Sequence, residues 1–96
     1  MIKIKAEILL YKDGRTTPFI SGYRPAFDFI PGAKTSGKIE LIDCSHLYPG
    51  QRAEVFIYFL TNKYLGEDFS EGNFFTFGEG GPPLGEGIIT EIISLA

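Results

Sequence analysis

Cysteine and histidine are each present only once in this chain of 96 residues, as Cys44 and His46. A single cysteine excludes an intramolecular disulfide. Zinc sites usually take about four nitrogen or sulfur ligands, so no metal site is expected. Apolar runs are also short, and none approaches the ~20 residues of a membrane helix. The first residues alternate apolar and charged side chains, unlike a signal peptide. We therefore expect a soluble cytoplasmic protein without metal or cofactor.

Basic residues are missing from the last third of the chain, because none follows Lys63. The formal net charge is −3. A non-specific nucleic-acid binder usually carries a basic stripe, so this balance argues against that class. Any contact with phosphate is expected in the first two-thirds of the chain. The alternative is that the lysines there only solvate the faces of strands.

No arrangement typical of catalysis is found. The loop at residues 78–87 is rich in glycine, but it has no lysine or hydroxyl residue, and Pro82 and Pro83 lack two of the N–H groups that a phosphate would need. Cys44 and His46 lie too close in sequence to pair as nucleophile and base. We therefore expect no enzyme. The acidic pairs fall in predicted loops, which favours solvated charges over acid–base catalysis: Glu67 with Asp68, and Glu79 with Glu86.

Alternation with a period of two dominates the chain. In residues 2–11 the even positions are apolar through Leu10 and the odd positions are charged through Glu7, as in a half-buried strand. Six such strands separated by Gly/Pro turns predict one domain, residues 1–96, built as a closed barrel or a sandwich. The other strands are predicted at 23–30, 38–42, 53–60, 73–77 and 87–94, with turns at 13–14, 31–32, 35–37 and 49–50, and a long connection at 61–72 anchored by Leu65 and Phe69.

Aromatic and aliphatic residues of three predicted strands indicate the core. The strand at 53–60 is apolar at most positions, which predicts cover on both faces. Phe75 and Phe77 share one face of their strand and Phe74 lies on the other. A face left exposed would be available to a protein partner or to stacking bases. In the last strand the candidate core residues are Ile89, Ile92 and Ile93.

A series of short glycine and proline motifs runs through nearly the whole chain. The most specific is Gly22-Tyr23-Arg24-Pro25. In order and spacing the series resembles the C-terminal β-barrel domain (domain III) of the translation elongation factor Tu family. We expect this domain to stand alone here, as a diverged chain without the GTPase domain. The resemblance implies an all-β fold, a six-stranded antiparallel closed barrel. The motifs are Gly22-Tyr23-Arg24-Pro25, Gly37-Lys38-Ile39-Glu40-Leu41, Pro49-Gly50, Glu71-Gly72, Gly78-Glu79-Gly80-Gly81 and Gly85-Glu86-Gly87.

The resemblance also implies candidate contacts. In that family the barrel holds the T-stem backbone of aminoacyl-tRNA and meets the nucleotide-exchange factor. Arg15 resembles a basic contact to the T-stem and Gly80 a backbone contact. Ser36 stands near the position of a threonine contact, and Lys63 resembles a lysine contact. These four residues are the candidate RNA or partner contacts of this chain.

The chain also departs from the family pattern at four positions of that footprint. Thr16 stands where the family has histidine, Ala26 replaces a glutamine, and Gly78 and Pro82 replace two arginines. Contacts with phosphate dominate affinity for nucleic acids, so these losses are expected to weaken tRNA binding by orders of magnitude. We therefore expect a non-catalytic module that docks a protein partner, such as a translation factor or a GTPase. Weak tRNA binding and a folded remnant without an active role are the alternatives.

Overall fold

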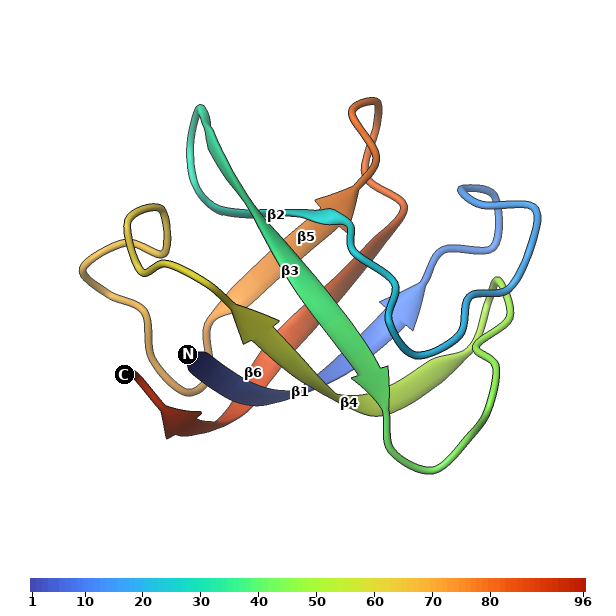
Figure 1. Ribbon diagram of the computed structural model, residues 1–96. Helices are drawn as coiled ribbons and strands as arrows, with labels where there is room; N and C mark the ends of the chain where they lie inside the picture. The colour runs from blue at the N-terminus through green and yellow to red at the C-terminus, as the bar shows by residue number, and fades with distance from the viewer.

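Six antiparallel strands close into a barrel in the computed structural model, which describes all residues, Met1–Ala96 (Figure 1). Around the barrel the order is β1-β4-β3-β2-β5-β6, and β6 pairs with β1 to complete the ring. Closure leaves no strand edge unpaired. The predicted fold class is confirmed, and the sandwich is excluded. The strands are β1 (Ile2–Leu10), β2 (Ala26–Ile30), β3 (Ala33–Leu41), β4 (Arg52–Phe59), β5 (Phe74–Gly78) and β6 (Gly85–Ser94).

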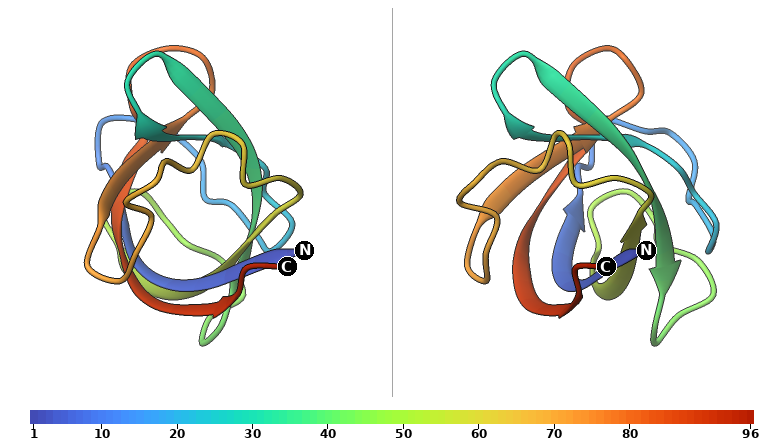
Figure 2. Two further views of the ribbon diagram at one scale, coloured as in Figure 1. Left: turned by 90° about the vertical axis from the view of Figure 1, so that its left-hand side faces the viewer. Right: turned by 60° about the vertical axis from the view of Figure 1, so that its left-hand side comes forward.

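The two ends of the chain lie side by side at one end of the barrel (Figure 2). The N-terminal ammonium group donates a hydrogen bond of 2.6 Å to the backbone oxygen of Ala96. No helix in the structure has the length and apolar character that crossing a membrane requires.

Strand β1 contributes its whole inner face to the core. The apolar even positions predicted from the alternation are all buried, which confirms the period of two in this strand: Ile2, Ile4, Ala6, Ile8 and Leu10. The long connection between β4 and β5 is anchored as predicted, because Leu65 is buried and Phe69 packs against the core.

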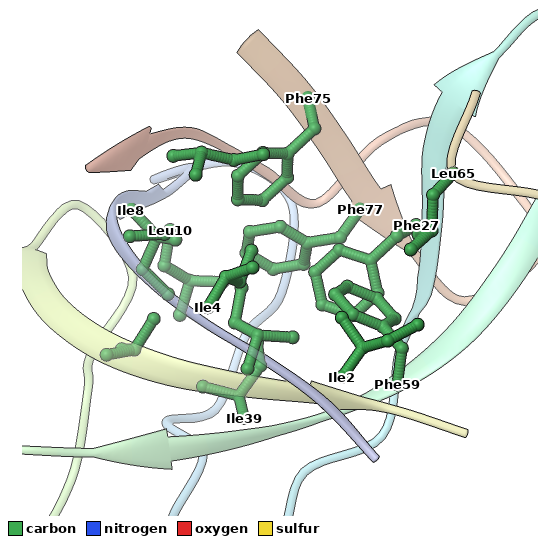
Figure 3. Packing of buried hydrophobic residues seen from close by; sticks show 14 of the residues in the cluster. Ile2, Ile4, Ile8, Leu10, Phe27, Ile39, Phe59, Leu65, Phe75 and Phe77 are labelled. Carbon is green, nitrogen blue, oxygen red and sulfur yellow. The ribbon is translucent and has the colours of Figure 1, made fainter. Parts of the chain in front are cut away.

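Phe27 of β2 lies at the centre of an aromatic cluster (Figure 3). Its ring centroid lies 5.3 Å from that of Phe59, 5.7 Å from that of Phe75 and 5.8 Å from that of Phe77. Phe75 and Phe77 are buried on one face of β5, whereas Phe74 is exposed on the other, as the alternation predicts.

Two glycines of β6 make room for the phenylalanines of β5. Gly85 pairs with Phe77 and Gly87 with Phe75 across the β5–β6 ladder. A Cβ atom on Gly87 would lie 2.5 Å from Cζ of Phe75, and one on Gly85 would overlap the ring of Phe77. The Gly-x-Gly of β6 is therefore the steric complement of the Phe-x-Phe of β5.

The predicted turn at residues 35–37 is wrong. These residues lie inside β3, and the hairpin turns instead at Pro31 and Gly32, where Gly32 has a positive φ of 77°. Glycine is needed at position 37 for close packing, not for a turn of the chain. A Cβ on Gly37 would lie 2.6 Å from Cε1 of the buried Phe59.

Some strand limits and faces also differ from the predictions. β2 begins at Ala26 rather than at residue 23, since Tyr23 forms only an isolated bridge to Ile39. β6 begins at Gly85 rather than at residue 87. Ile93 was predicted in the core but is 42% exposed, because register shifts in the β1–β6 ladder alter which side chains of β6 face inward.

Candidate functional site

The four predicted contact residues do not all come together. Arg15 lies in the connection between β1 and β2, and Gly80 lies in the turn between β5 and β6. Ser36 is exposed on β3 and pairs with Ala26, whose other neighbour is Gly78 at the start of that turn. The fourth, Lys63, lies in the connection between β4 and β5. Figure 1 shows this connection on the side of the chain termini, opposite the β1–β2 connection.

Arg15 is held by its own chain rather than presented to solvent. Its Nη1 donates to Oε2 of Glu79 at 2.7 Å. Its Nε donates to the backbone oxygen of Thr17 at 3.0 Å, and Nη2 donates to that of Pro18 at 3.3 Å. The guanidinium also lies 4.8 Å from the centroid of the Tyr23 ring, within the range of a cation–π interaction. All three nitrogens of the guanidinium therefore have partners.

Tyr23 joins the two ends of this cluster. Its hydroxyl donates to the same Oε2 of Glu79 at 2.5 Å, and its ring stacks on Phe19 with centroids 4.5 Å apart. Two glycines in the left-handed region shape the backbone on either side, Gly22 with φ of 102° and Gly80 with φ of 97°. The predicted Gly22-Tyr23-Arg24-Pro25 motif thus supplies a turn and an aromatic residue of the cluster.

The charges of the cluster compensate one another. The hydrogen bond from Tyr23 lowers the pKa of Glu79, and the hydrogen bond and charge of Arg15 lower it further. Burial is the main reason that the pKa of Tyr23 is raised, and the hydrogen bond from Tyr23 to Glu79 raises this pKa further. At neutral pH the carboxylate of Glu79 is ionised and paired with the arginine. An anionic ligand must therefore compete with Glu79 for the guanidinium.

A shallow groove of about 670 Å³ adjoins the cluster, between residues 15–23 and His46. The imidazole of His46 has Nδ1 3.0 Å from Oγ of Ser45, and the thiol of Cys44 is exposed. No three His, Cys, Asp or Glu side chains are grouped so that they could hold a metal ion. The lining of the groove therefore combines the paired Arg15 guanidinium with the rings of Phe19, Tyr23 and His46.

The remaining predicted motif residues occupy separate places. Pro25 is buried directly before β2, and Arg24 is exposed beside it. Gly81 has no atom within 4 Å of the position that a Cβ would take. Gly85 and Gly87 lie opposite the phenylalanines of β5. A comparison with models of known protein families finds none that matches this chain.

Two apolar residues form a pair on the outer face of the barrel, and the sequence predicted the outward position of only one of them. Phe74 is 57% exposed, and it pairs directly with Ile88 of β6, which is 48% exposed. The alternation placed Phe74 opposite the core-facing phenylalanines, but no local signal marked Ile88. Only the register of β5 against β6 brings the two side chains together. They form a contiguous apolar patch, which we name the Phe74–Ile88 patch.

Proposed function

We propose that the barrel is a non-catalytic module that docks a protein partner through the Phe74–Ile88 patch. The proposal rests on the observation that two large apolar side chains face solvent as direct cross-strand neighbours. Contiguous exposed apolar side chains typically mark interaction sites, and buried aromatic anchors often dominate the energy of protein interfaces. The patch lies on paired strands, so it is held rigidly and needs little ordering when it binds.

The state of Arg15 supports this proposal over an RNA-binding role. Its guanidinium is already neutralised by Glu79, and the chain as a whole carries a net charge of −3. The resemblance of the sequence motifs to the C-terminal barrel of the elongation factor Tu family narrows the class of partner. We infer a cytoplasmic translation factor or a GTPase as the protein that docks.

A photo-cross-linking experiment tests this function. The photoreactive residue p-benzoylphenylalanine replaces Phe74, and the protein is irradiated in lysate of its own host. We expect one protein to be captured in stoichiometric amount. The double substitution Phe74→Ser and Ile88→Ser is expected to weaken binding of that purified protein by about 30-fold or more, as loss of an interface hot spot does.

The matched control removes a similar apolar pair elsewhere on the surface. Ile20 and Tyr48 are both exposed and lie outside the patch, so the variant Ile20→Ser with Tyr48→Ser is expected to bind normally. Both double variants should stay folded, because exposed substitutions change stability little. If the partner binds equally well to the variant lacking Phe74 and Ile88, the proposed docking site is wrong.

A second candidate function is weak binding of tRNA at the Arg15 cluster. It is favoured by one observation, namely that Arg15 contacts the turn that carries Gly80, so two of the four candidate contacts lie together. Ser36 of β3 is separated from the start of this turn by β2, where Ala26 pairs with both Ser36 and Gly78. An incoming phosphate would replace the Glu79 carboxylate as the anionic partner of the guanidinium.

Fluorescence anisotropy with labelled tRNA tests this candidate. Glu79→Gln is expected to tighten binding, because it frees the guanidinium from its ion pair. Arg15→Ala is expected to weaken binding and to lower the slope of log K against log salt by about 1, the value for one phosphate contact. Lys12→Ala serves as the control, since Lys12 is exposed outside the cluster. Binding that does not depend on salt or on Arg15 would exclude this candidate.

A further inference from the structure

A row of side chains crosses three neighbouring strands on the outer face. Lys3 of β1 pairs with Tyr58 of β4, and Tyr58 pairs with Lys38 of β3. The Lys3 and Lys38 ammonium nitrogens lie 5.3 Å and 4.9 Å from the centroid of the Tyr58 ring. Lys3 also lies 4.2 Å from the centroid of Phe56. We name Lys3, Tyr58 and Lys38 the cationic row.

The cationic row carries positive charge that the chain hardly neutralises. Lys3 has no carboxylate within the 4.0 Å of an ion pair, and Lys38 has only Glu40, at 3.7 Å. The neighbouring Lys5, by contrast, is paired with Glu54 at 3.1 Å. The two like charges flank one ring and repel each other, so an anion placed close to both would be stabilised by both. This local excess stands out in a chain of net charge −3.

Apolar surface lies directly beside the cationic row. Phe59 pairs with both Ile2 and Gly37, so the next residue, Leu60, follows Tyr58 on the same outer face. Leu60 is 80% exposed, the most exposed large apolar side chain of the barrel. It lines a groove of about 260 Å³ together with Leu95 and other residues near the termini. A cationic strip and an apolar groove therefore form one continuous surface.

We propose that this surface binds an acidic amphipathic segment of a partner protein. Carboxylates of the segment lie on the solvent side of Tyr58, within reach of Lys3, Lys38 and the Tyr58 hydroxyl, and a large aliphatic side chain lies against Leu60. The proposal rests on the proposed docking function and adds the chemistry of the partner. It uses a face distinct from the Phe74–Ile88 patch, so the two surfaces can be tested separately.

Other occupants fit this surface less well. The ammonium groups of Lys3 and Lys38 already lie over the Tyr58 ring, and that of Lys3 lies over Phe56, so unpaired bases would have to displace them to stack. A peptide cannot add to the sheet as an extra strand, because the barrel is closed. Recognition must therefore use side chains, and those present are cationic and aliphatic.

Selection from a phage-displayed library of random twelve-residue peptides tests the proposal on the folded protein. The peptides recovered are expected to combine several Asp or Glu residues with a large aliphatic residue. Titration calorimetry then gives their affinities. Lys3→Gln with Lys38→Gln is expected to weaken binding about tenfold at low salt and to reduce its dependence on salt. Leu60→Ser is expected to weaken binding without changing the dependence on salt.

The control variant removes the same two charges elsewhere. Lys12 lies in the β1–β2 connection, and Lys34 pairs with Asp28 of β2. Both are exposed outside this surface, so Lys12→Gln with Lys34→Gln should bind the selected peptides like the unaltered protein. The proposal is overturned if no peptide is recovered, if the peptides lack carboxylates, or if loss of Lys3 and Lys38 leaves their binding unchanged. It is also overturned if single-stranded RNA, but no acidic peptide, binds through these lysines.

The two proposals fail in different ways. If a partner is cross-linked from position 74 while no acidic peptide depends on the cationic row, the docking function stands and this surface is wrong. If acidic peptides bind the row but nothing is captured from position 74, the chemistry proposed here stands and the Phe74–Ile88 patch is wrong.

Discussion

Replacing Gly85 with alanine is expected to lower the free energy of unfolding by about 3 kcal/mol, the upper part of the usual range for an overpacked core. The added Cβ would lie 2.7 Å from the backbone oxygen of Leu9 and would overlap the ring of Phe77. Leu9 belongs to β1, which pairs with β6, and Phe77 is fully buried. Neither neighbour can move aside without disturbing the barrel. For a domain of this length such a loss is a large part of the total stability.

Urea denaturation of the two alanine variants Gly85→Ala and Gly81→Ala measures this effect. Gly81 is the matched control, because a Cβ at that position would meet no atom within 4 Å. Its substitution is expected to change the free energy of unfolding by less than about 0.5 kcal/mol. Equal stability of the two variants would contradict the close packing of β6 on β5.

Phe27→Ala is expected to destabilise the protein by about 3 to 5 kcal/mol, the usual range for removing a buried phenylalanine. The loss combines lost burial with a cavity that the closed barrel cannot collapse to fill. Phe27 is fully buried, and its ring lies in the aromatic cluster between strands from both sides of the barrel. The rings nearest to it belong to Phe59, Phe75 and Phe77.

Phe74→Ala provides the comparison for this second measurement. Phe74 is also a phenylalanine of the barrel wall but points outward, so its loss is expected to change stability by about 0.5 kcal/mol or less. Thermal or urea unfolding of both variants gives the difference. If Phe27→Ala unfolds no more easily than Phe74→Ala, the aromatic cluster does not stabilise the barrel as described.

These stability measurements also serve as controls for the binding experiments. The substitutions that test binding change exposed or half-buried residues of the surface, whereas Gly85 and Phe27 are buried. A loss of binding without a loss of stability therefore identifies a docking residue rather than a structural one. The aromatic residues of β5 illustrate the division, because Phe75 and Phe77 are buried in the core and Phe74 is exposed.

Strand positions and buried faces followed from the sequence wherever a local period was strong. In β1 the alternation of isoleucine with charged residues specified the inner face, because successive side chains of a strand point to opposite sides. The same rule separated Phe74 from Phe75 and Phe77. The turn predicted at residues 35–37 was wrong although the alternation continues there, because the small residues resembled a turn while Gly37 is required for packing against Phe59.

The alternation by itself determined that this chain is a set of short half-buried strands, and the motif series indicated the barrel. Only the tertiary structure decided which strands are neighbours. The neighbours in turn decide which side chains lie together on each proposed binding surface. Arg15 meets Glu79 across 64 residues, and the cationic row joins β1 to β4, although β2 and β3 lie between them in the chain. Register between distant strands depends on closure and core packing, which no local pattern of residues encodes.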